Sequence, residues 1–131
     1  MDIFVVNQNP DSKYNDEVGK RYDYPTSIPN GKQIKIGDIL IFNLSSKSSK
    51  KLKLGDKRIT GIGKIDSIII YNSETKEMAI ASYEWYKQFQ NPLSFEDIGG
   101  DPRSNISNSI NRILSDARIE ILLNLIRFTK I

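Results

Sequence analysis

Short apolar runs, each ended by polar or turn-forming residues, make up the first part of the chain. Ile3–Val6 is a β-rich run that stops at the letters NQNP. Ile39–Asn43 follows the Gly37-Asp38 turn and is apolar at consecutive positions, which is typical of a strand buried on both faces. We therefore predict two short buried strands at these positions.

A longer apolar stretch occupies the middle of the chain. Arg58–Tyr71 reads RITGIGKIDSIIIY and predicts a long strand. Gly61 and Gly63 interrupt it, which indicates a bulge or a close approach by another group. A polar turn at Asn72–Glu77 then leads into another predicted strand at Met78–Tyr86.

The segments between these strands are polar and predict irregular structure. Residues 11–32 form a long loop rich in tyrosine, and such loops in small domains are often functional. Residues 44–57 form a lysine-rich loop. Residues 89–95 predict a loop that enters a short strand, 98–102 a turn, and 104–109 a polar connection able to become helical.

The last segment has the clearest helical pattern. Ser115 is a suitable N-cap, and the apolar positions after it form one broad face: Ala117, Ile119, Ile121, Leu122, Leu125 and Ile126. Several short strands with one terminal helix favour a mostly β (α+β) fold, a small β-barrel with peripheral helices and a C-terminal helix. The length of 131 residues fits a single domain over 1–131.

The chain contains no cysteine and no histidine. This composition excludes disulfides, Cys/His zinc sites, Ser-His-Asp triads and Cys-His dyads. We expect a binding module without cofactor or metal; an enzyme, such as a small hydrolase, would depend on carboxylates, lysine or tyrosine. No signal peptide or membrane-length apolar run is visible, so we expect a cytoplasmic protein that does not enter a membrane.

Positive charge is concentrated in one segment although the net charge is only +3. Asp56 is the only acid among the cationic residues Lys47, Lys50, Lys51, Lys53, Lys57 and Arg58. Such a segment is either a solvated loop or a surface that contacts nucleic-acid phosphates, where counterion release favours binding. The sequence leaves both readings open.

Aromatic residues gather in the segments YDYP and YEWYKQF. Tyr22, Tyr24, Tyr83 and Trp85 are candidates to hold an unpaired base between aromatic faces, with Trp85 as the stacking platform. Core packing is the more common role of a single aromatic residue, and a cage for a methylated group is a further alternative.

Polar residues at the predicted strand ends are the second group of candidates. Asn7 follows the first strand and Ser45 follows the second, where their side chains are placed to read a base edge. Both are also ordinary turn residues. We include them in the candidate base-binding site.

The order of the segments resembles the PUA-like superfamily, and within it the EVE and YTH-like domains. The resemblance rests on IFVVNQNPDSKY, GDILIF with NLSS, TGIGKIDSI, NPLSF and the closing NSINRILSDARIEILL. YNDEVGKRYDYP followed by GD is similar to the N-terminal reader domains of HNH- and McrB-type restriction enzymes. This resemblance implies a barrel whose aromatic pocket holds an extruded, often modified, base and whose basic surface holds the DNA backbone.

We therefore expect a reader of modified DNA that serves as the specificity module of a modification-dependent restriction system. Its partner would be double-stranded DNA with a modified base. A fused or associated nuclease or NTPase would supply any catalysis, and the chain would be the N-terminal part of a longer protein. An RNA-binding module of the same superfamily and a protein-interaction domain are the alternatives.

Overall fold

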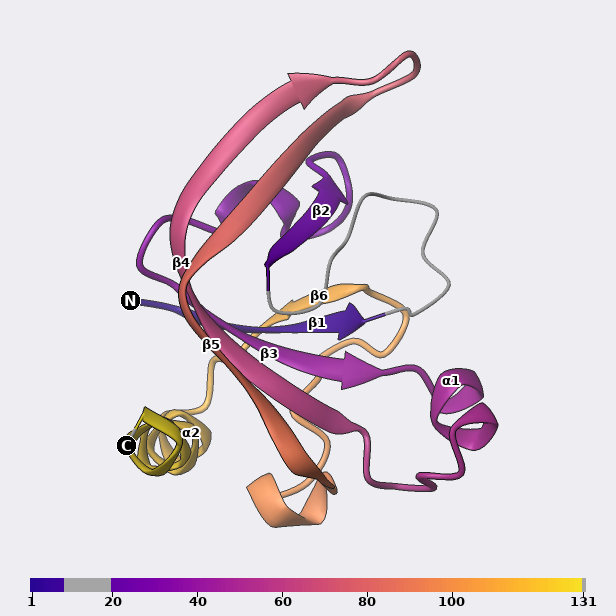
Figure 1. The fold of residues 1–131 in the computed structure, drawn as a ribbon, viewed down its shortest axis with the longest axis vertical. Helices are drawn as coiled ribbons and strands as arrows, with labels where there is room; N and C mark the ends of the chain where they lie inside the picture. The colour runs from indigo at the N-terminus through magenta and orange to yellow at the C-terminus, as the bar shows by residue number, and fades with distance from the viewer. Residues whose placement is uncertain (9–19, 131) are drawn as a thin grey trace.

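The computed structural model describes residues 1–8 and 20–130, with side chains up to residue 127. Its strands form one curled sheet in the order β2-β5-β4-β3-β1-β6 (Figure 1). The strands are β1 (Ile3–Gln8), β2 (Arg21–Pro25), β3 (Ile39–Leu44), β4 (Ile59–Asn72), β5 (Glu77–Leu93) and β6 (Ile110–Arg112). The helices are α1 (Ser46–Lys51) and α2 (Asp116–Lys130), with short 3-10 turns η1 (Gly31–Gln33) and η2 (Glu96–Ile98). The predicted mostly β fold with a C-terminal helix is confirmed.

The apolar runs of β1 and β3 lie side by side at the centre of the sheet. They pair in parallel, with Ile3 opposite Ile39 and Asn7 opposite Asn43. Every residue of β3 is buried, as the sequence predicted for a strand covered on both faces. Successive side chains alternate between two clusters on opposite faces of the sheet.

The inner cluster lies inside the bend of the sheet, and the outer cluster lies on the other face (Figure 1). The inner cluster contains buried side chains of β1, β2 and β3, among them Phe4, Tyr24 and Phe42. The outer cluster contains Val5, Ile41 and other buried residues, and α2 covers it with Leu122, which is 0% exposed. The protein is therefore a curled sheet with one apolar layer on each face.

The two longest strands, β4 and β5, bend together and carry the sheet around the inner cluster (Figure 1). Their pairing shifts register between Lys64 and Ile65 and again between Ile65 and Ser67. Such bulges increase local bending and twist. The close approach predicted at the two glycines is also confirmed: a Cβ at Gly61 would lie 2.5 Å from the Tyr86 hydroxyl, and one at Gly63 would lie 3.0 Å from the Tyr83 ring.

Several predicted loops have regular structure instead. Arg21–Pro25, expected within an irregular loop, is strand β2, because it pairs with β5 at Met78–Ser82. Ser46–Lys51, expected within a loop, is helix α1, whose N-cap is Ser45. Strand β5 continues to Leu93 through the predicted loop. The predicted turn at 98–102 begins at the last residue of η2, and the connection 104–109 is not helical. Residues 11–19 of the predicted tyrosine-rich loop lie outside the described residues.

Helix α2 begins as predicted. The Ser115 hydroxyl accepts a hydrogen bond of 3.3 Å from the Arg118 backbone N–H, which satisfies one free donor of the first turn. The apolar face is narrower than predicted and slightly rotated: Ala117 and Ile121 are exposed, while Leu123 packs on the outer cluster. Among the described residues, no helix is both long and apolar enough to cross a bilayer.

Candidate nucleic-acid interface

Two of the predicted base-binding tyrosines belong to the inner core. Tyr22 and Tyr24 occupy alternate positions of β2, and their rings stack with centroids 5.0 Å apart. Phe42 meets Tyr22 edge-on at 6.3 Å. Tyr22 is 6% exposed and Tyr24 2% exposed, so their ring faces are covered by protein. The two tyrosines therefore belong to the packed core, and neither offers a ring face to a ligand.

Tyr83 and Tyr86 extend this aromatic stack towards the surface. Their ring centroids lie 5.8 Å and 5.5 Å from that of Phe42 and 5.4 Å from each other. Both side chains are half-buried. They are the aromatic rings of the inner cluster that the protein covers only in part.

Trp85, the predicted stacking platform, lies elsewhere. It is half-buried and packs against the outer cluster, on the sheet face opposite Tyr83 and Tyr86. The bulge opposite Lys64 and Ile65 causes this separation, since Trp85 pairs with Lys64 while Tyr83 pairs with Ile65. The structure thus brings together Tyr22, Tyr24 and Tyr83 but not Trp85.

Four polar side chains lie beside the aromatic rings of the inner cluster. We call Gln8, Thr60, Tyr86 and Gln88 the inner rim. The Thr60 hydroxyl donates to Gln8 Oε1 at 2.7 Å, and the Tyr86 hydroxyl donates to Gln88 Oε1 at 2.6 Å. Gly61 follows Thr60, pairs with Gln88 and lies under the Tyr86 hydroxyl, which places the two hydrogen-bonded pairs side by side.

Asn7 and Ser45, the predicted polar readers, have structural partners. Asn7 continues the outer-face positions of β1, and its Oδ1 accepts a hydrogen bond of 3.1 Å from Asn43 Nδ2. The Ser45 hydroxyl accepts a hydrogen bond of 3.1 Å from the Ser48 backbone N–H and thereby caps α1. Neither residue belongs to the inner rim.

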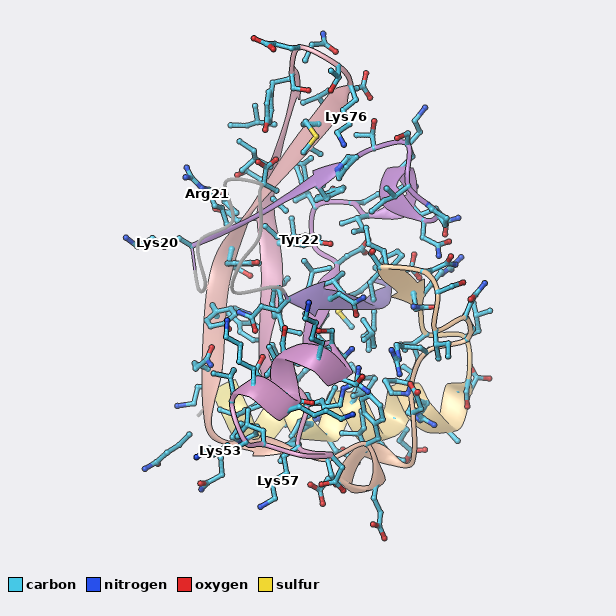
Figure 2. All side chains as sticks on the ribbon, turned by 90° about the vertical axis from the view of Figure 1, so that its right-hand side faces the viewer. Lys20, Arg21, Tyr22, Lys53, Lys57 and Lys76 are labelled. Atoms are coloured by element: carbon cyan, nitrogen blue, oxygen red, sulfur yellow. The ribbon has the colours of Figure 1, made fainter. Side chains whose placement is uncertain are left out.

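The lysines of the predicted basic surface lie on α1 and the segment that returns to β4. Lys47, Lys50, Lys51, Lys53 and Lys57 are exposed, and in Figure 2 Lys53 and Lys57 point away from the body of the protein. Within the described part of the chain, Lys47, Lys50, Lys53 and Lys57 form no ion pair. This segment joins β3 to β4, so it ends next to Thr60 of the inner rim in the sequence.

Arg58 differs from these lysines because its guanidinium is held in place. Its Nε donates to the Leu44 carbonyl at 2.7 Å, and the guanidinium lies 5.0 Å from the centre of the Phe95 ring. Arg103 lies over the same ring at 5.3 Å and pairs with Asp101. Burial lowers the pKa of Arg58, the charge of Arg103 lowers it further, and Asp101 acts in the opposite direction.

The stability of the protein at high pH is expected to depend on the ionisation of the buried tyrosines. Burial raises the pKa of both Tyr24 and Tyr86 to about 12, above the ordinary value of 10.0. As pH rises from about 10 to about 12, the unfolded chain loses protons that the folded protein keeps, so the free energy of unfolding should fall. Urea unfolding across this range should show a shallower fall for Tyr86→Phe. An unchanged slope would contradict the raised pKa of Tyr86.

A separate hollow of about 440 Å³ lies beside η1. It is lined by Thr26, Ser27, Ile28, Asn30, Lys32 and Gln33. Among the described residues, its lining includes no aromatic side chain.

Comparisons with known proteins do not assign this chain to a family. No protein-family model matches this chain, and no curated protein sequence matches it. The resemblance to PUA-like domains therefore stays a prediction that rests on the order of the sequence segments. The described residues contain no group of three or more carboxylate, cysteine or histidine side chains placed to hold a metal ion.

Proposed function

We propose that this chain is a nucleic-acid-binding module that reads a base extruded from duplex DNA, in particular a modified base. One observation carries the proposal: the lysine segment begins after Leu44, the residue that pairs with Gln8 of the inner rim, and it ends just before Thr60 of the same rim. The lysine segment leaves the end of β3 and returns at the start of β4, next to the inner rim. A bound duplex therefore contacts both surfaces at once.

The energetics of reading an extruded base fit this arrangement. Flipping a base costs a few kcal/mol, and the cost is lowest for a mismatched base. Stacking on an aromatic side chain returns about 1–3 kcal/mol per base. Tyr83 and Tyr86 supply the rings, while Lys47 and Lys50 supply attraction to the phosphates without a competing ion pair in the described residues.

The proposed role is binding rather than catalysis. The chain has no histidine or cysteine to act as nucleophile or base, and burial raises the pKa of Tyr86 rather than lowering it. In a modification-dependent restriction system, the nuclease or NTPase would be another domain or subunit, acting with this module in the cytoplasm.

A titration with matched duplexes tests this function. The protein is expected to bind a duplex with one mismatched base more tightly than the fully paired duplex, and a duplex with a methylated base more tightly than the plain one. Tyr83→Leu should reduce the mismatch preference roughly 10-fold, because a stacking ring is lost. Trp85→Leu is the matched control on the opposite face of the same strand and should retain the preference.

The proposal fails if the wild-type protein shows no affinity for any duplex, or if Tyr83→Leu and Trp85→Leu behave alike. Circular dichroism on both variants establishes that each is folded. A matched RNA competitor added to the same titration distinguishes the alternative function, since displacement by RNA at lower concentration than by DNA would replace the DNA assignment with an RNA-binding one.

A further inference from the structure

Arg58 is held against the end of β3 through both its backbone and its side chain. The Leu44 backbone N–H donates to the Arg58 carbonyl at 2.8 Å, and Arg58 Nε donates to the Leu44 carbonyl at 2.7 Å. The guanidinium also lies 5.0 Å from the centre of the Phe95 ring. Because guanidinium nitrogens only donate, these contacts determine which end of the group faces the protein. Arg58 is therefore a cation with a fixed orientation.

The two Nη groups at the other end of Arg58 have no hydrogen-bond partner within the described residues. Neither is among the buried, unpartnered polar atoms of that part of the chain, and Arg58 is half-buried, so both Nη groups keep contact with solvent. Arg58 also forms no ion pair with a described carboxylate. A planar fork of N–H groups with this exposure matches two oxygens of one phosphate.

A second guanidinium adds positive charge at the same place. Arg103 lies 5.3 Å from the centre of the Phe95 ring that Arg58 also contacts. Asp101 accepts two side-chain hydrogen bonds from Arg103, from Nε at 2.9 Å and from Nη2 at 2.7 Å. Burial and the charge of Arg103 both lower the pKa of Arg58, and Asp101 opposes them only in part. One carboxylate therefore faces two cations, which favours an anion at this position.

We propose that Arg58 binds a phosphate group through its two Nη groups, with Arg103 strengthening the site by its charge. The inference rests on the proposed function for the source of the phosphate, which is the backbone of the bound duplex. A phosphate contact from a held side chain fixes the position of a duplex, whereas exposed lysines such as Lys57 supply attraction with little orientation. Arg58 is therefore the contact that orients the duplex.

Inorganic phosphate tests the site without DNA. The backbone amide signals of positions 58 and 59 are followed by ¹⁵N–¹H NMR while phosphate replaces sodium chloride at constant ionic strength. Wild-type protein is expected to show saturable shifts. Arg58→Lys keeps the charge but loses the planar fork, so its affinity for phosphate should be roughly 10-fold lower. Shifts that do not saturate, or equal affinity in Arg58→Lys and wild type, overturn the site.

Asp101→Asn tests the contribution of Arg103. The amide keeps an acceptor oxygen for Arg103 but removes the negative charge, so the affinity for inorganic phosphate should rise roughly 3-fold. Asp66→Asn, at an exposed position of β4, gives the same net charge and should leave the affinity unchanged. A role limited to packing around Phe95 predicts no rise. No rise in Asp101→Asn, or an equal rise in both variants, overturns the part assigned to Arg103.

A fully paired duplex identifies the source of the phosphate. Arg58→Lys should weaken duplex binding roughly 10-fold, while the charge-conserving control Lys57→Arg at the adjacent exposed position should stay close to wild type. Equal affinities in the two variants overturn Arg58 as a backbone contact. Saturable phosphate binding by a wild type that binds no duplex supports the site with free phosphate as its ligand and overturns the proposed function. Circular dichroism establishes that each variant is folded.

Discussion

Replacing Lys47 and Lys50 with Gln is expected to weaken binding to every DNA duplex by roughly 10- to 100-fold at moderate salt. Both side chains are exposed on α1, and neither has an ion-pair partner among the described residues. Each lysine that neutralises a phosphate releases a counterion, so the slope of log K against log salt should become shallower by about 2. Fluorescence anisotropy at several salt concentrations measures both quantities.

A matched control removes two positive charges from another surface. Lys32→Gln with Lys35→Gln gives the same net charge, and both lysines are exposed near η1. This control should change affinity only slightly and leave the slope close to that of the wild type. Equal effects from the two double variants would mean that net charge alone attracts the DNA, and the α1 segment would then be an ordinary solvated surface.

The largest loss of stability is expected from Leu122→Ala in α2. Leu122 is 0% exposed and inserts into the outer cluster, where it holds the helix on the sheet. Truncating a buried leucine removes its apolar contacts and leaves a cavity, so the free energy of unfolding should fall by about 2–5 kcal/mol. Urea unfolding with an unchanged m-value measures the change.

Ile121→Ala is the neighbouring control, since Ile121 is 40% exposed and points away from the outer cluster. Its effect should stay below about 1 kcal/mol. The apolar pattern alone placed both residues on the same buried face, so the pair of variants distinguishes that pattern from the observed packing. Similar losses for the two variants would show that α2 is rotated from its position in the structure.

Much of the fold follows from local sequence signals. The consecutive apolar residues of β3, the turn before it and the cap at Ser115 each act over a few residues, so they are readable without tertiary information. Strand β2 was missed because Arg21–Pro25 is polar at alternate positions and gains its regular structure only by pairing with β5. Strand β6 is short and polar and was missed for the same reason, as it depends on β1.

The candidate site was predicted in part. The sequence pointed to Tyr22, Tyr24, Tyr83 and the lysines, and the structure stacks Tyr24 on Tyr22 and places Tyr22 and Tyr83 edge-on to Phe42. Sequence patterns offered little indication of Gln88 and Thr60, because both look like ordinary surface positions of a strand. The available signal was the pair Gly61 and Gly63, because glycines facing a neighbouring strand leave room for aromatic rings such as Tyr86.

The sequence by itself determined the composition of the faces: alternating apolar residues, glycines where rings approach, and no histidine or cysteine for catalysis. Only the tertiary structure decided which aromatic residues share a face. Side chains of a regular strand alternate, so Tyr83 and Trp85 would lie together and Tyr86 apart from them. The bulge in β5 adds one residue between Tyr83 and Trp85, and that single shift moves Trp85 to the outer cluster and Tyr86 to the inner rim.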